Sequence, residues 1–94
     1  MLLASLFLLA GCNKAAALEK KLKSEAPAGC EAYCGTASCG ITCREPAAIE
    51  KAKLLFVAHC AEVKEIGTKG RVQVVAHMET NQDFDSDTCT FPPK

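Results

Sequence analysis

Seven cysteines are the residues of this sequence best suited to chemistry, because a thiol can form a disulfide, bind a metal or attack a substrate. They stand at positions Cys12, Cys30, Cys34, Cys39, Cys43, Cys60 and Cys89. So many cysteines in 94 residues are typical of small exported proteins that disulfides hold together. An odd number, however, leaves one thiol without a partner in an oxidising compartment.

Motifs for catalysis are missing from the sequence. Redox catalysis needs a thiol of low pKa, typically in C-x-x-C, and no such pair occurs. The sequence also lacks G-x-S-x-G, H-E-x-x-H, a P-loop, a glycine-rich nucleotide motif and a c-type haem motif. A chain this short leaves little room for a substrate cleft. We therefore expect no enzymatic activity and no cofactor.

Two histidines and a pair of cysteines would supply ligands of the type that zinc uses. The candidates are His59, His77, Cys60 and Cys89, but their spacing matches no recognised metal motif. In an oxidising compartment the thiols favour disulfides over metal binding. We expect no native metal site at these residues.

Carboxylates alternate along residues 83–87, as they do at the start of a calcium-binding loop. Asp83, Asp85 and Asp87 fit that opening, but Thr88 stands where the loop needs glycine. Lys94 stands where the loop needs a bidentate glutamate. The sequence therefore favours a solvated acidic turn.

The first ten residues form an apolar run without a single charge. As a helix rising about 1.5 Å per residue, the run spans roughly half of a ~30 Å hydrocarbon core. It is too short for a transmembrane helix and suits the apolar part of a signal peptide. Because signal peptides begin with positive residues and none precedes this run, we expect the natural start to lie further upstream.

The run ends in Leu9-Ala10-Gly11-Cys12, which resembles the lipobox of bacterial lipoproteins. The resemblance implies cleavage after Gly11, lipid on Cys12 and a permanent anchor in a membrane, since two or three acyl chains make release negligible. In lipoproteins of this type an aspartate after the cysteine often signals retention in the inner membrane. Asn13 stands there instead, so the resemblance favours the outer membrane of the bacterial cell envelope.

Assigning Cys12 to lipid leaves six cysteines, an even number. Cysteines four apart lie on one face of a helical turn, so each pair is better placed to bridge a facing turn than to bridge within itself. Two short helical turns around Gly35 would nest Cys30–Cys43 outside Cys34–Cys39 and leave Cys60 for Cys89. Six cysteines nevertheless allow fifteen connectivities, and the sequence alone does not choose between them.

The remaining residues predict a small α+β, disulfide-rich fold. We divide the chain into a signal peptide (1–11), a lipidated, solvated and partly helical tether (12–29) and a small disulfide-stapled domain (30–94). Proline at position 46 and glycine at 67 predict one main helix over about 46–66, followed by a short strand or hairpin over about 71–79. In a rival interpretation residues 54–57 form a strand. The predicted core-facing stripe is Ile49, Ala52, Phe56, Cys60, Val63 and Ile66.

A formal net charge of zero and a low aromatic content argue against a nucleic-acid partner. We expect a non-catalytic binding or assembly module, anchored to the membrane through Cys12 and facing an envelope protein partner. One alternative is an anchored, disulfide-rich inhibitor or effector of an external protein. A further alternative is a metal or thiol-redox sensor that uses the histidines together with Cys60 and Cys89.

Overall fold

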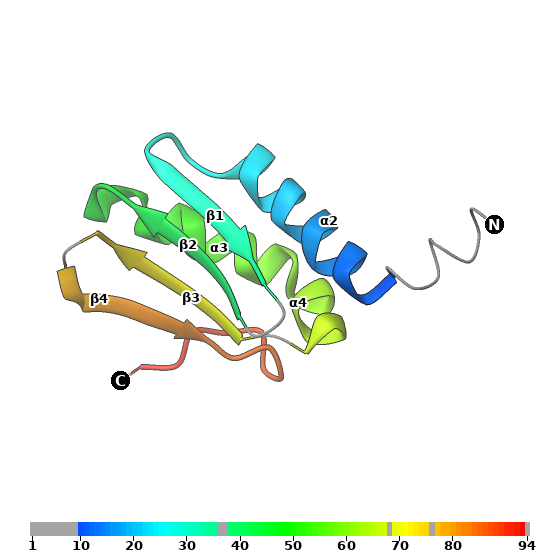
Figure 1. Cartoon of the computed structure of the whole chain (residues 1–94). Coiled ribbons are helices and arrows are strands. Elements are labelled where there is room, and N and C mark those ends of the chain that lie inside the picture. The colour runs from blue at the N-terminus through cyan, green and yellow to red at the C-terminus, as the bar shows by residue number, and fades with distance from the viewer. Residues whose placement is uncertain (1–9, 36–37, 68, 76, 94) are drawn as a thin grey trace.

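Helices lie along one face of a four-stranded sheet, as Figure 1 shows. This computed structural model describes residues 10–35, 38–67, 69–75 and 77–93. It confirms the predicted small, disulfide-rich α+β fold. In chain order the elements are α2 (Ala10–Glu25), β1 (Cys30–Cys34), β2 (Ser38–Cys43), the 3-10 helix η1 (Pro46–Ala48), α3 (Ile49–Ala58), α4 (Cys60–Ile66), β3 (Lys69–Val74) and β4 (His77–Phe84).

The strands follow one another across the sheet in the order β1-β2-β3-β4. β1 and β2 are antiparallel, β2 and β3 are parallel, and β3 and β4 are antiparallel. Parallel neighbours need a crossover connection, and α3 with α4 supplies it between β2 and β3. The sheet therefore has two edge strands, β1 and β4.

The prediction of two cysteine-bearing helical turns is wrong, because residues 30–43 form the β1–β2 hairpin. Side chains alternate along a strand, so cysteines four apart share a face in a strand just as they do in a helix. In the hairpin register Cys30 lies opposite Cys43, and Cys34 lies opposite Cys39. The spacing therefore favoured the correct pairing, but it did not distinguish a strand from the predicted helical turns.

The predicted main helix over 46–66 is divided into three helical pieces at Ala48 and His59. Pro46 begins the 3-10 turn, as expected for a residue that fixes φ and lacks an N–H. At His59 the backbone leaves the helical region, with φ −106° and ψ 24°, and α4 starts anew at Cys60. Gly67 closes α4 with a left-handed φ of 69°. The rival strand over 54–57 is wrong.

The strand or hairpin predicted over 71–79 is a hairpin of two longer strands, β3 and β4. Val74 pairs with His77, and the register shifts between Val72 and Val74. β3 starts earlier than predicted because Lys69 and Gly70 pair with β2. A side chain at position 70 would meet Phe56 and Phe84, so this strand position requires glycine.

α2 differs from the expected solvated segment. It is a sixteen-residue helix whose inner side packs against β1 and α4. Leu18 and Leu22 are completely buried, and Ala15 is nearly so. These residues are spaced by three and four positions, which places them on one side of a helix. The helical half of residues 12–29 is therefore a core element, although its overall hydrophobicity is low.

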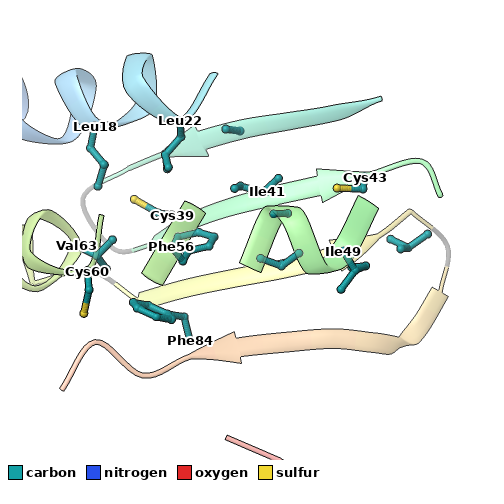
Figure 2. Close-up of a cluster of buried hydrophobic side chains, with 14 residues drawn as sticks. Leu18, Leu22, Cys39, Ile41, Cys43, Ile49, Phe56, Cys60, Val63 and Phe84 are labelled. Atoms are coloured by element: carbon teal, nitrogen blue, oxygen red, sulfur yellow. The ribbon is translucent and has the colours of Figure 1, made fainter. Parts of the chain in front are cut away.

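The core lies between the helices and the sheet (Figure 2). Its centre is Phe56, whose ring lies 5.5 Å from that of Phe84 and 6.1 Å from that of Phe91. The predicted stripe is buried at five of its six positions, with Ile66 partly buried beside them. Leu18 and Leu22 enter from α2, and Ile41 from the sheet.

Candidate functional site

Three disulfides connect the six cysteines that follow Cys12. The pairs are Cys30–Cys43, Cys34–Cys39 and Cys60–Cys89, so the nested arrangement expected from the sequence is confirmed. The two hairpin bridges lie on the face of the sheet that the helices cover, and the sulfurs of β2 are fully buried there. Cys12 lies in the first turns of α2 and is the one cysteine outside this set.

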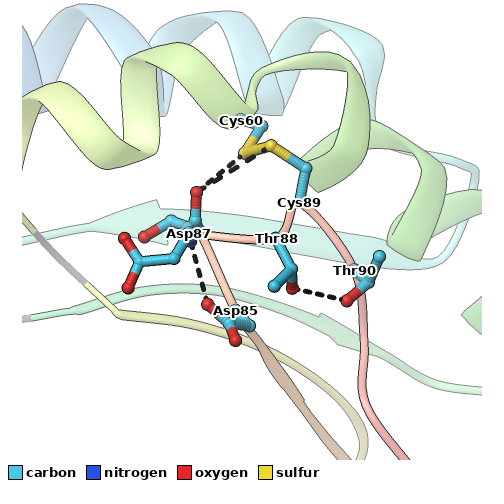
Figure 3. The surroundings of a disulfide bond; sticks show 7 residues. Cys60, Asp85, Asp87, Thr88, Cys89 and Thr90 are labelled. Atoms are coloured by element: carbon cyan, nitrogen blue, oxygen red, sulfur yellow. Dashed lines mark hydrogen bonds between the residues drawn. A yellow bond between two sulfur atoms is a disulfide. The ribbon is translucent and has the colours of Figure 1, made fainter.

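The third bridge fastens the C-terminal turn to α4 (Figure 3). The carbonyl oxygen of Ser86 lies 3.3 Å from Sγ of Cys60, a close contact rather than a hydrogen bond, because a disulfide sulfur carries no proton. Asp85 and Thr90 exchange two backbone hydrogen bonds and so close the turn. Cys89 adopts a positive φ of 57°, which non-glycine residues rarely do. The bridge therefore holds a tight turn in place.

Two of the three carboxylates of residues 83–87, those of Asp83 and Asp85, have different partners. Arg71 donates from Nε to Asp83 at 2.9 Å. Asp85 accepts the backbone N–H of Asp87 at 2.8 Å, which stabilises the turn. Within residues 10–35, 38–67, 69–75 and 77–93, no cluster of three potential ligands is placed to hold a metal ion.

α2 is fixed to the rest of the protein by polar contacts as well as by its leucines. Lys14 pairs with Glu65, and Lys21 pairs with Glu62 at 2.9 Å, so both ion pairs join α2 to α4. Glu19 accepts the backbone N–H of Cys34 at 2.8 Å, on the free edge of β1. That hydrogen bond lowers the pKa of Glu19. These contacts are distributed over residues 14–21 of the helix.

His59 lies between two carboxylates at the junction of α3 and α4. Its Nδ1 is 2.8 Å from Glu62, and its Nε2 is 3.2 Å from Glu25 at the end of α2. The hydrogen bond with Glu62 is the main reason that the pKa of His59 is raised, and Glu25 raises it further. The imidazolium form can donate to both carboxylates at once. His59 thus links the C-terminal end of α2 to α4.

Four residues could supply zinc ligands by their type, and the structure gives three of them other partners: His59, His77, Cys60 and Cys89 are the four, and His77 is the exception. Both thiols are consumed by one disulfide, and His59 faces glutamates. His77 begins β4, and its side chain lies outside the part that the structure describes. This group therefore offers no described zinc site of mixed histidine and cysteine ligands.

The second face of the sheet is free of helices (Figure 1). Tyr33 lies across Gly40 there, because a Cβ at position 40 would meet its ring at 2.4 Å. The tyrosine is 47% exposed. Arg71 and Asp83 form their ion pair on the neighbouring strands β3 and β4. One exposed aromatic ring and a charged pair suit contact with another protein, since tyrosine and arginine are enriched at interfaces.

A groove of about 880 Å³ opens beside this face, at the end of the sheet where β3 begins and β4 ends. Tyr33 forms part of its wall. Charges of both signs line it, three basic and three acidic: Lys64, Lys69, Arg71, Asp83, Asp85 and Asp87. The groove therefore has no strong field of one sign and can bind groups that carry both charges.

No protein-family model matches the chain, and comparisons with curated proteins and with solved structures find no match either. Among the described residues, no helix has both the length and the apolar character needed to cross a membrane. Most of the apolar run, residues 1–9, lies outside the described part, including Leu9 of the lipobox-like segment. The other three residues of that segment, Ala10, Gly11 and Cys12, belong to α2.

Several residues important to the structure could not be recognised from the sequence. Three glutamates form hydrogen bonds with partners 15, 34 and 3 residues away in the chain, and they are Glu19, Glu25 and Glu62 in that order. Only the last contact left a local signal, because residues three apart in a helix are neighbours. Tyr33 could have been found from its strand position alone, since it alternates with the cysteines and must point to the opposite face.

Proposed function

We propose that this protein is a lipid-anchored lipoprotein of the bacterial envelope, and that its small domain is a non-catalytic binding or assembly module. The observation that carries the proposal is the cysteine pairing. Six thiols are used in three disulfides, which suit an oxidising compartment, and Cys12 remains for lipid at the end of the lipobox-like segment.

Mass spectrometry of the mature N-terminus tests the anchor. We expect a chain that begins at Cys12 and carries diacylglycerol and acyl groups. Cys12→Ser is expected to abolish membrane attachment while leaving the three disulfides and the fold unchanged. A serine variant that still fractionates with membranes, or a mature wild-type chain with an unmodified thiol, would overturn the proposal.

The choice between membranes depends on the residue that follows the anchor. Asn13→Asp introduces the aspartate that, by resemblance to lipoproteins of this type, signals retention in the inner membrane. We expect this variant to move from the outer to the inner membrane, whereas a matched Asn13→Ser variant stays. Separation of the two membranes on a density gradient measures the difference, and identical distributions would contradict an outer-membrane location.

The helix-free face of the sheet supports the binding part of the proposal, because it presents Tyr33 beside the Arg71–Asp83 pair. A photo-crosslinking residue at position 33 is expected to trap one reproducible envelope protein. The matched control is position 54, since Leu54 is 65% exposed but lies on α3. Equal capture at both positions would show that this face binds nothing specifically.

A further inference from the structure

We infer that the anchor holds the domain directly against the membrane, and that the end of the sheet formed by α4, the last residue of β1 and the groove faces the phospholipid headgroups. The inference rests on the proposed lipidation of Cys12 and adds an orientation to it. A lipid anchor alone does not imply this orientation, because a flexible tether would let the domain turn freely.

Very little free chain separates the anchor from the domain. Cys12 already lies in α2, and Ala15, one helical turn further on, is nearly buried. Three residues of helix span about 4.5 Å. Leu18 and Leu22 follow on the same side of the helix and are fully buried. The anchored residue is therefore continuous with a core helix, and moving the domain away from the bilayer would require α2 to leave the core.

α2 starts at the end of the molecule where α4 lies (Figure 1). Glu19 contacts the end of β1 at Cys34, and Lys14 contacts Glu65 in the last turn of α4. Cys12 precedes Glu19 by seven residues, so it lies about 10 Å further along the helix axis. Figure 1 shows the start of α2 at the same end of the molecule as α4. This end is consequently the one nearest the anchor.

The end of the molecule nearest the anchor carries the charged groove. β2 and β3 start there, since Ser38 pairs with Lys69, and β4 ends there, since Phe84 pairs with Gly70. The groove with both basic and acidic walls opens at this end. Zwitterionic headgroups carry a phosphate and an ammonium group. The lysines and aspartates of the groove that lie outside the Tyr33–Arg71–Asp83 surface complement these two charges, namely Lys64, Lys69, Asp85 and Asp87. Lys64 and Lys69 on its rim are also able to attract anionic lipids.

The chain contains no tryptophan, so a single introduced tryptophan reports its own surroundings. Glu65→Trp places it in the last turn of α4, near the anchor and outside the groove, and Val75→Trp places it beyond the far end of β3. A six-residue strand separates the two regions by about 20 Å. Both native side chains are exposed. The lipidated proteins are placed in vesicles of phosphatidylethanolamine and phosphatidylglycerol that contain brominated lipids.

We expect brominated lipid to quench the tryptophan at position 65 at least threefold more than the one at position 75. Gly35→Trp and Ala47→Trp form a second pair at the near and far ends, in case the first pair does not fold. Equal quenching at both ends would overturn the orientation. Failure of the anchor itself is distinguished by flotation, because a protein without lipid does not float with the vesicles at all.

Discussion

The carboxylate of Glu19 accepts the backbone N–H of Cys34 at 2.8 Å and so joins α2 to the free edge of the sheet. An exposed edge strand offers unpaired N–H and C=O groups to other chains. Pro27 accepts the N–H of Cys30 at the other end of β1. The edge of β1 is thereby occupied at both ends by groups from its own chain.

Replacing Glu19 tests the strength of this link. We expect Glu19→Ala to lower the free energy of unfolding by about 1 to 2 kcal/mol, because a charge-assisted hydrogen bond is lost. Glu19→Gln retains an acceptor and is expected to lose less. The pKa of Glu19 is lowered, so its contribution is present above pH 4.5 and disappears as the pH falls through the lower folded-state pKa.

Urea unfolding of both variants between pH 3 and 7 measures this effect. The gap between wild type and Glu19→Gln should narrow in acid. Glu31→Ala removes an exposed carboxylate of β1 and serves as the control, with an expected change within about 0.5 kcal/mol. A gap that is independent of pH would show that the charge of Glu19 is unimportant.

His59 gives the protein a second pH dependence, of opposite sign. Its pKa is raised by Glu62 and Glu25, so its contribution is complete below about pH 6.5 and is lost as the pH rises through the folded-state pKa. We expect stability to fall by about 1 to 2 kcal/mol across that range, since hydrogen bonds to charged groups are lost. His59→Gln should abolish the fall, as measured by urea midpoints between pH 5.5 and 8.5. His77→Gln is the control and should retain it.

Burial of α2 is tested most directly at its leucines. Leu22→Ala is expected to cost about 2 to 5 kcal/mol, because its side chain is completely buried and its removal leaves a cavity. Leu54→Ala removes the same atoms from a side chain that is 65% exposed and should change stability little. Lys14→Ala should cost less than about 1 kcal/mol, as exposed ion pairs contribute little. Similar urea midpoints for the two leucine variants would mean that α2 does not pack against the sheet.

The failure to predict α2 as part of the core has a physical cause. Its apolar content is limited to one narrow stripe, and the flanking lysines and glutamates look like those of a solvated spacer. The spacing of the cysteines led to a prediction of helical turns where the structure has strands, because a spacing of four is compatible with both. The nested pairing was one of fifteen connectivities that the sequence allowed, and it fits either geometry.

Local signals succeeded where one residue type dictates the backbone. Pro46 begins a helical segment and Gly67 ends one, as the sequence predicted. The break at His59 carried no such signal, because no proline or glycine accompanies it. The contacts of Glu19 and Glu25 join residues far apart in the chain, so they follow from the tertiary fold and not from any local pattern.

The disulfides should differ in their contributions to stability. In the chain-entropy model the loss on removal grows with the loop that the bridge closes. Sequence separations of 29, 13 and 5 residues give roughly 3.5, 3 and 2 kcal/mol for Cys60–Cys89, Cys30–Cys43 and Cys34–Cys39. Paired cysteine-to-alanine variants, compared by urea unfolding, measure the order. A larger loss for Cys34–Cys39 than for Cys60–Cys89 would contradict the entropic account.

Two glycines of the sheet can be compared as a matched pair. Aromatic side chains cover Gly70 on the face toward the helices and Gly40 on the helix-free face. At Gly70 a new Cβ would lie 2.9 Å from the buried ring of Phe56, which cannot move away. We expect Gly70→Ala to cost about 1 to 3 kcal/mol through overpacking. At Gly40 a new Cβ would meet the half-exposed ring of Tyr33, which can swing outward. Gly40→Ala should therefore cost less stability than Gly70→Ala. In a Tyr33→Ala background this stability loss should disappear.

Tyr33 is the only tyrosine in a chain without tryptophan, so its fluorescence reports this movement directly. Gly40→Ala should change the tyrosine emission, whereas Gly35→Ala, where the nearest atom is 3.8 Å away, should leave it unchanged. Equal stability losses for Gly40→Ala in the presence and absence of the Tyr33 ring would show that the ring does not lie across Gly40.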